Sequence, residues 1–204
     1  MKIIILGGFL GSGKTSVMLQ IAKHIIGDDP VDSSQVVIIE NEIGEISVDG
    51  KMFASGGYEV ANMFSGCVCC TMSGELVVGL YNVIRDFHPQ FILLEGTGVA
   101  YPDNIRTTIL ESMPDMPIQV TCVVDSKRWM RLVRPMEMLL KDQLTNADVI
   151  LLNKTDAIEA DVLNEVETSV RTFNDRATFY AVSANQTIPA SVLEEITGIT
   201  REVE

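Results

Sequence analysis

A glycine-rich segment near the N-terminus carries residue types that bind phosphate. Residues 8–15 read GFLGSGKT and fit the pattern G-x-x-x-x-G-K-[ST], after an apolar run and before a helix-like segment. Glycines let such a loop curl so that backbone N–H groups face phosphate oxygens, and the helix start adds its positive dipole end. Lys14 is expected to reach the β and γ phosphates, and the Thr15 hydroxyl is expected to ligate Mg²⁺. The predicted nucleotide-binding residues of this loop are Gly8, Gly11, Ser12, Gly13, Lys14, Thr15 and Ser16.

A carboxylate suited to the magnesium ion or its water shell follows a later apolar run. Residues 91–98 read FILLEGTG, which places Glu95 at the carboxyl end of an expected strand. Ligands collect at that edge of a parallel sheet, so Glu95 is expected to lie near the phosphate loop. A carboxylate at a strand end is also a common solvated turn residue, and the phosphate loop is what favours a functional role. We therefore predict a catalytic set of Lys14, Thr15 and Glu95.

A second polar loop predicts that the base is guanine. Residues 153–156 read NKTD; alone this is an ordinary polar turn, but its position downstream of a phosphate loop indicates a base-binding role. The carboxylate of Asp156 can accept hydrogen bonds from N1–H and N2–H of guanine, a paired contact that adenine cannot reproduce. The stem of Lys154 can lie along the base plane, and Asn153 can tie this loop to the phosphate loop. A backbone N–H for the guanine carbonyl is expected from the later loop that contains Ala184.

Three thiols in one short glycine-rich loop predict a transition-metal site. Thiolates select zinc, copper(I) and related soft ions, and an extended C-x-C segment can direct both of its sulfur atoms at one centre. The predicted ligands are Cys67, Cys69 and Cys70. Three ligands do not complete a tetrahedral zinc site, and possible auxiliary carboxylates follow the second apolar run, at Glu40, Glu42 and Glu45. The alternative is a set of reduced, packed cysteines, of which Cys122 in the apolar run VTCVV is an example.

Composition limits the classes of partner. The formal net charge is -13 and the sequence pI is about 4.5, which opposes sequence-independent binding to nucleic acid or to an anionic membrane. No run approaches the roughly 18 apolar residues of a membrane helix, and the N-terminus lacks the features of a signal peptide. Crowded cysteines suit a reducing compartment better than a disulfide framework. We therefore expect a cytoplasmic protein with neither nucleic acid nor membrane as its partner.

Apolar, β-branched runs alternate with helix-like segments along the chain. The expected strands are 3–6, 36–40, 91–95, 119–125, 148–153 and 177–183, and the expected helices are 14–26, 75–87, 136–146 and 159–173. Near-continuous apolar strands require cover on both faces, and this alternation implies right-handed crossovers between parallel strands. We therefore predict an α/β fold of three layers, with a mostly parallel sheet and helices on both faces, as in P-loop NTPases. Residues 1–204 are expected to form a single domain, with a hairpin and loops inserted over residues 44–74.

The order of these motifs resembles that of the CobW/HypB/UreG family of metallochaperone P-loop GTPases, most of all its CobW-type branch. The matching segments are GGFLGSGKTS, IIENEIGE, GCVCCT, LLEGTGVAYP and NKTD, and GCVCC is the most specific of them. The resemblance implies binding of GTP or GDP with Mg²⁺, a metal at the cysteines, and delivery of that metal to a client metalloenzyme. CobW-type proteins commonly carry a second, C-terminal domain. Residues 1–204 are therefore expected to correspond to the nucleotide-binding domain without it.

These features give a mechanistic hypothesis. Nucleotide and Mg²⁺ would order the loop after Glu40, GTP would bring two copies of the chain together, and hydrolysis would release the metal to the client. Turnover is expected to be slow, because no glutamine or arginine finger can be assigned from the sequence. Zinc is the default metal for thiolate ligands, with cobalt and nickel as alternatives. Two other interpretations stay open: a metal-responsive, GTP-dependent regulatory switch, and a small-molecule kinase that would leave NKTD and GCVCC unexplained.

Overall fold

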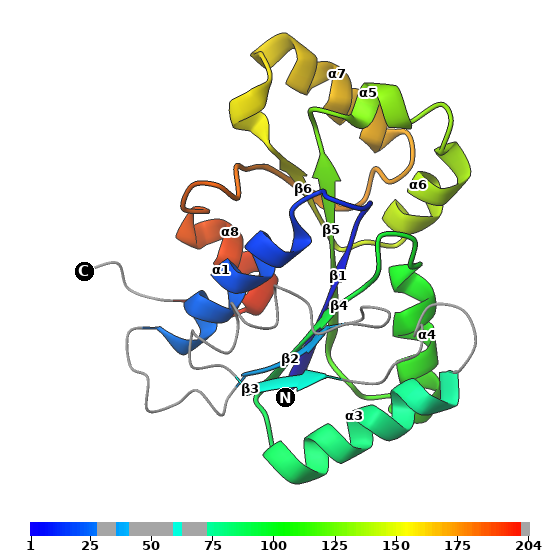
Figure 1. Ribbon diagram of the computed structural model, residues 1–204, viewed down its shortest axis with the longest axis vertical. Coiled ribbons are helices and arrows are strands. Elements are labelled where there is room, and N and C mark those ends of the chain that lie inside the picture. Colours follow the sequence, from blue (N-terminus) through cyan, green and yellow to red (C-terminus); the bar gives the residue numbers. More distant parts are fainter. Residues whose placement is uncertain (28–35, 41–58, 63–72, 201–204) are drawn as a thin grey trace.

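A seven-stranded parallel sheet forms the centre of the protein (Figure 1). The computed structural model describes residues 1–27, 36–40, 59–62 and 73–200. The strands are β1 (Lys2–Gly7), β2 (Val36–Glu40), β3 (Glu59–Asn62), β4 (Phe91–Glu95), β5 (Ile118–Asp125), β6 (Val149–Asn153) and β7 (Thr178–Ala181). Their order in the sheet is β3-β2-β4-β1-β5-β6-β7, and every neighbouring pair is parallel. The carboxyl ends of all seven strands therefore meet at one edge.

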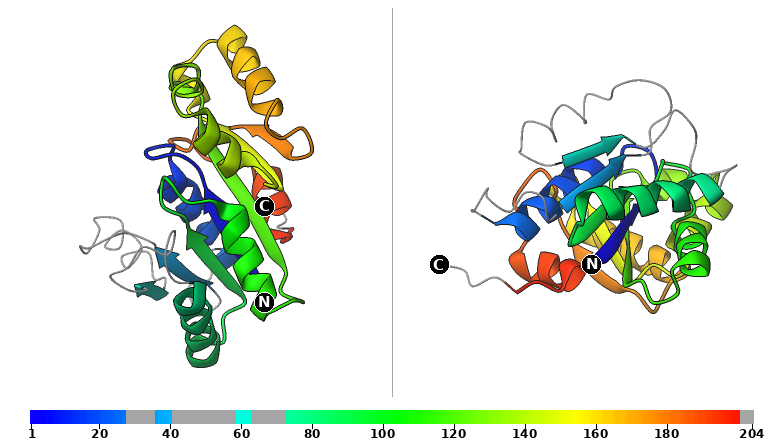
Figure 2. Two further views of the ribbon diagram at one scale, coloured as in Figure 1. Left: turned by 90° about the vertical axis from the view of Figure 1, so that its right-hand side faces the viewer. Right: turned by 90° about the horizontal axis from the view of Figure 1, so that it is seen from below.

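Helices cover both faces of this sheet. They are α1 (Lys14–Ile26), α3 (Ser73–Phe87), α4 (Pro102–Ser112), α5 (Trp129–Leu132), α6 (Glu137–Leu144), α7 (Ala160–Arg171) and α8 (Ala190–Thr197), with a 3-10 turn, η2 (Thr155–Ala157). Helices α1 and α8 pack against one face, and α3 to α7 contribute to the core on the other. Figure 2 shows α1 and α4 on opposite sides of the sheet.

The alternation of side chains along the strands produces the two cores. In β1, Ile3 and Ile5 belong to one buried cluster, whereas Ile4 and Leu6 belong to the other. Successive side chains of a strand point to opposite faces, so an uninterrupted apolar strand needs cover on both. The predicted three-layer α/β fold with a parallel sheet is confirmed.

Strand β3 and helices α4 and α5 are among the elements that the sequence did not predict. Strand β3 lies within the segment 44–74 but pairs in parallel with β2, so residues 59–62 are not an arm of a hairpin with that strand. Residues 44–58 and 63–72 of the expected insertion lie outside the described residues.

Helix α4 was not expected, because its single buried stripe is short and polar residues surround it. Across the described chain, no helix is long and apolar enough to cross a membrane.

Candidate nucleotide-binding site

The segment between β1 and α1 forms a glycine-dependent turn at the carboxyl edge of the sheet. Gly8 has φ 133° and Gly13 has φ 100°, values that residues with a side chain rarely adopt. A Cβ added to Gly8 would overlap the carbonyl oxygen of Val123, and one added to Gly13 would overlap the side-chain amide of Asn153. Helix α1 begins at Lys14, so its positive end faces this turn. The local geometry suits an anion held by backbone N–H groups.

Lys14, Thr15 and Glu95 lie together beside this turn. Strand β4 pairs with β1 so that Glu95 is the register partner of Leu6, just before the phosphate loop. The Thr15 hydroxyl donates to Glu95 Oε2 at 3.2 Å, and Lys14 Nζ lies 3.9 Å from Glu95 Oε1. Lys14 is only 6% exposed, and its ammonium also donates to the Gly8 carbonyl at 3.2 Å. The structure thus brings the predicted catalytic set to one point.

The residues of this loop fit a phosphate and a magnesium ion. Mg²⁺ prefers oxygen ligands, which the Thr15 hydroxyl and the Glu95 carboxylate supply. Ser12 is fully buried, and its Oγ atom has no hydrogen-bond partner within the described part of the chain. Such an atom at the base of the loop is chemically suited to a phosphate oxygen or to water. Ser16 is exposed on the first turn of α1.

Asn153 joins the phosphate loop to the loops that were predicted to bind the base. It is 2% exposed at the end of β6, and its Nδ2 atom donates to the Ser12 carbonyl at 2.8 Å. Its Oδ1 atom accepts the Ala184 N–H, also at 2.8 Å. The Ala184 N–H thus donates to Asn153 in this structure, and its contact with a guanine carbonyl stays a prediction. Gln20 of α1 holds the same loop by donating to the Ala184 carbonyl at 3.1 Å.

Asp156 is presented at the surface next to Asn153. Lys154 has a left-handed backbone, with φ 65°, which turns the chain into η2 directly after β6. The Thr155 hydroxyl donates to the Val182 carbonyl at 3.0 Å and holds this turn against the neighbouring strand. The carboxylate of Asp156 is exposed and accepts a hydrogen bond from the Ser183 hydroxyl. The carboxylate is thereby oriented while part of it stays accessible to a base.

Asp125 was not assigned from the sequence, although it anchors the outer turn of the phosphate loop. Its Oδ2 atom accepts from Lys154 Nζ at 2.7 Å and from Arg128 Nε at 2.6 Å. The same two cations donate to loop carbonyls: Lys154 to Gly11 at 2.6 Å and Arg128 to Leu10 at 2.5 Å. Burial alone would raise the pKa of Asp125, but the hydrogen bonds from Lys154 and Arg128 outweigh it and lower this pKa. Its position at the end of a buried strand was the available sequence signal.

The predicted transition-metal site can be placed only through the strands that lead to it. Strand β2 ends at Glu40 and β3 ends at Asn62, and these two residues are register partners. The remaining predicted ligands lie outside the described residues: Glu42, Glu45, Cys67, Cys69 and Cys70. Within residues 1–27, 36–40, 59–62 and 73–200, no group of three or more His, Cys, Asp or Glu side chains is placed to hold a metal ion.

Cys122 differs in chemistry from a metal-binding cysteine. It is fully buried in β5, and its thiol donates to the Gln143 carbonyl at 2.9 Å. Burial raises the pKa of Cys122 to about 12, so the group stays protonated at neutral pH. At pH 8 we expect a thiolate population about 1,000-fold below that of a thiol with an ordinary pKa. Mass spectrometry after brief alkylation should find the Cys122 peptide unmodified in native protein and modified in denaturant. Equal labelling in both states would contradict this assignment.

The strand, glycine loop and helix that hold the phosphate site, together with the parallel sheet, define a P-loop nucleotide-binding protein. The family model for the nucleotide-binding domain of CobW/HypB/UreG matches residues 2–181, and the chain belongs to this family.

Relatives with known names support this assignment. The zinc chaperone YeiR of Escherichia coli is 32% identical over 152 residues, which cover 73% of this chain and 45% of YeiR. The crystal structure of the Zn(II)-bound YjiA GTPase of E. coli has a TM-score of 0.58 and 25% identity, covering 99% of this chain and 63% of that one. The hydrogenase maturation factor HypB of Archaeoglobus fulgidus has a TM-score of 0.69 at 15% identity over 97% of this chain and 89% of that one, which shows the fold alone. The chain spans about half the length of the curated relatives it matches, 45% of YeiR and 57% of YjiA.

Proposed function

We propose that this chain is the nucleotide-binding part of a GTP-dependent metallochaperone that delivers a transition metal to a client metalloenzyme. The binding of a guanine nucleotide is supported mainly by two hydrogen bonds of 2.8 Å, through which Asn153 joins the phosphate loop to the loop that contains Ala184. These hydrogen bonds hold the phosphate turn next to the loops after β6 and β7. A guanine nucleotide suits this pair of loops, because Asp156 can accept from N1–H and N2–H of the base. A small-molecule kinase is not favoured, since its chemistry does not need a base loop of this kind.

Hydrolysis at this site is a phosphoryl transfer to water. Water attacks the γ phosphorus and the bond to the β–γ bridging oxygen breaks, which gives GDP, inorganic phosphate and a proton. Lys14 stabilises negative charge on the β and γ phosphates, and Thr15 with Glu95 would hold Mg²⁺, which neutralises charge on the phosphate oxygens. Arg128 lies against the phosphate loop, but its guanidinium donates to Asp125 and to Leu10 on the outer side. We therefore expect turnover well below about one per second in the isolated chain.

The metal is the cargo in this proposal. Cys67, Cys69 and Cys70 bind it, and Glu40, Glu42 and Glu45 lie in the segment that would link this site to the nucleotide. Zinc is the first candidate, because YeiR and YjiA carry zinc in their names and thiolates bind it well, with cobalt and nickel as alternatives. The register pairing of Glu40 with Asn62 supports the coupling, since each of these residues directly precedes a segment with predicted ligands. We extend the proposal to a homodimer that forms with GTP in the reducing cytoplasm.

Nucleotide and metal titrations test both halves of this proposal. Calorimetry should show that GTP and GDP bind at least about 100-fold more tightly than ATP and ADP, as expected when a paired hydrogen-bond contact to a carboxylate is lost. Zinc should bind with one equivalent fewer in a variant with serine at all three positions, Cys67, Cys69 and Cys70. Cys122→Ser is the matched control and should keep the wild-type zinc stoichiometry.

Three outcomes of these titrations would refute parts of the proposal. Equal affinity for guanine and adenine nucleotides would refute the assignment of the base. An unchanged zinc stoichiometry in the triple serine variant would refute the cysteine site while leaving the nucleotide site intact. A zinc affinity that is the same with GDP and with a non-hydrolysable GTP analogue would refute the coupling between the two.

A further inference from the structure

A buried glutamine of α6 holds the loop that follows Glu95. Gln143 is 1% exposed, and its Nε2 atom donates to the Gly98 carbonyl at 2.9 Å and to the Ala100 carbonyl at 3.3 Å. Both partners are carbonyl oxygens, which fixes the nitrogen of the carboxamide on this side. No motif points to a role for Gln143, which lies 45 residues from Gly98 along the chain.

The loop held by Gln143 lies directly against the phosphate loop. A Cβ added to Gly98 would come within 2.7 Å of the Leu10 backbone nitrogen, so only glycine permits this approach. The loop starts from a fixed point, because the Gly96 N–H donates to the Leu6 carbonyl at 2.9 Å. Since a peptide unit is planar and trans, directing the Gly98 carbonyl toward α6 turns the following N–H away from α6. Gln143 therefore sets the orientation of a peptide beside the phosphate loop.

The order of strands identifies which end of a nucleotide this loop meets. The base loops follow β6 and β7, on one side of β1, whereas β4 and its loop lie on the other side. A nucleotide whose β and γ phosphates meet Lys14 therefore extends its last phosphate toward β4 and Glu95. GDP has no group at that position. The contact through Gln143 is expected to affect the triphosphate more than the diphosphate.

Helix α6 gives Gln143 a rigid support. Leu140 and Leu144 are each 3% exposed in the core, and the carbonyl of Gln143 itself accepts the thiol of Cys122 on β5. The backbone that carries the Gln143 side chain is thus held in place by apolar packing and by a hydrogen bond to the sheet.

We propose that Gln143 is a positioning residue for the third phosphate: it fixes the loop 96–100 on the phosphate loop and so favours GTP over GDP. The inference rests on the proposed function, because it presupposes that guanine nucleotides bind at this site. It assigns to α6 a part in sensing the nucleotide state, although α6 is not expected to touch the nucleotide.

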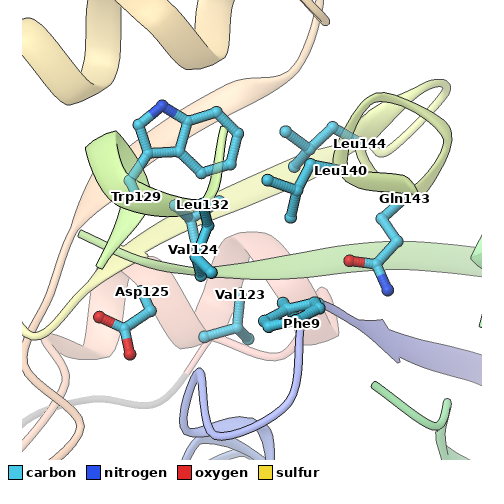
Figure 3. A pocket seen from close by; sticks show the side chains of 10 residues that line it. Phe9, Val123, Val124, Asp125, Trp129, Leu132, Leu140, Gln143 and Leu144 are labelled. Atoms are coloured by element: carbon cyan, nitrogen blue, oxygen red, sulfur yellow. The ribbon is translucent and has the colours of Figure 1, made fainter. Parts of the chain in front are cut away.

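The carboxamide oxygen of Gln143 has no partner among the described residues, so a substitution can remove the donors of this side chain without breaking a bond to its acceptor. Its Oε1 atom is buried without a hydrogen-bond partner among the described residues. Figure 3 shows this oxygen turned toward a small pocket that Phe9, Leu140 and Leu144 help to line. Gln143→Met keeps the length of the side chain and loses both donors, but it also removes the desolvated acceptor. Because the carbonyls of Gly98 and Ala100 lose their donor, we expect a melting temperature below that of the wild type. Gln143→Glu instead places acceptors against two carbonyls and is the stronger perturbation.

The test compares a non-hydrolysable GTP analogue with GDP on the full chain with Mg²⁺. For Gln143→Met we expect the analogue to bind about 10-fold more weakly, while the affinity for GDP stays within about twofold. Asn174→Leu is the matched control, because Asn174 is also a buried carboxamide that donates to two carbonyls, those of Leu144 and Ala147. It contacts neither nucleotide loop, so it should lower the melting temperature and leave the ratio of the two affinities unchanged.

The ratio of the affinities for the GTP analogue and for GDP distinguishes a failure of the role of Gln143 from a failure of the proposed function. If the wild-type chain binds both nucleotides and Gln143→Met keeps the wild-type ratio, the role of Gln143 is refuted and the proposed function stands. If the wild-type chain binds no guanine nucleotide, the proposed function fails and the inference fails with it. If Asn174→Leu changes the ratio as much as Gln143→Met does, general loosening around α6 explains the effect and the specific role is refuted.

Discussion

Replacement of Lys14 by alanine is expected to lower the affinity for GDP and GTP on the order of 100-fold, the largest loss from any single change in the phosphate loop. The side chain of Lys14 is 6% exposed, so little water screens its attraction for phosphate oxygens. Its removal also leaves the Glu95 carboxylate, 3.9 Å away, without that positive charge beside the phosphates. Attraction is lost and repulsion stays, and both effects weaken binding.

The measurement for Lys14→Ala is a titration with a fluorescent guanine nucleotide, together with a thermal unfolding curve without nucleotide. Lys23→Ala is the control, because Lys23 is an exposed lysine of the same helix, in the last turn and away from the loop. It should keep wild-type affinity. The site assignment would be wrong if both variants bound nucleotide equally well. Unfolding of Lys14→Ala at the temperature of the titration would be visible in the thermal curve, and the titration is then repeated at a lower temperature.

The phosphate loop can be predicted from sequence because its geometry is local. Gly8 and Gly13 adopt positive φ angles within one short segment, and Lys14 starts the helix that follows. The apolar runs also predict the sheet, since period-two burial on two faces demands cover from both sides. Glu95 is predictable for a related reason: the carboxyl end of a strand in a parallel sheet lies at the edge where ligands bind.

Contacts between distant segments are what the sequence leaves open. The side chains of Asp125, at the end of β5, and Gln143, in α6, contact segments that are distant in the sequence, and no spacing in the sequence encodes which groups they meet. The hydrogen bond from the Ala184 N–H to the side chain of Asn153 joins two segments 31 residues apart, and no sequence pattern indicates it. Strand β3 has only four residues, and its sequence, EVAN, is not a strong apolar run. Its position is therefore set by its pairing with β2 and not by its own sequence pattern. Such features follow from tertiary structure and not from local propensity.

Replacement of Asp156 by asparagine is expected to change which base the site prefers. The carboxylate is acceptor-only and suits the two donors N1–H and N2–H of guanine. An asparagine presents one donor and one acceptor, which suits the N1–H and C2 carbonyl of xanthine. We expect the affinity for GDP to fall on the order of 100- to 1,000-fold and the affinity for xanthosine diphosphate to rise above it. Titration of the variant with both diphosphates checks the exchange.

Two further variants separate the base contact from a general effect of charge. Glu159→Gln removes an exposed carboxylate three residues away, at the start of α7, and should leave the preference for guanine intact. Ser183→Ala removes the hydroxyl that donates to Asp156, so the carboxylate loses orientation but keeps its charge. Its affinity for GDP should fall by about 10-fold or less, with guanine still preferred over xanthine. If Asp156→Asn weakened binding of both diphosphates equally, the carboxylate would be supporting the loop and not reading the base. The exchange of preference is the result that requires direct contact, because stability and net charge change in the same way for either nucleotide.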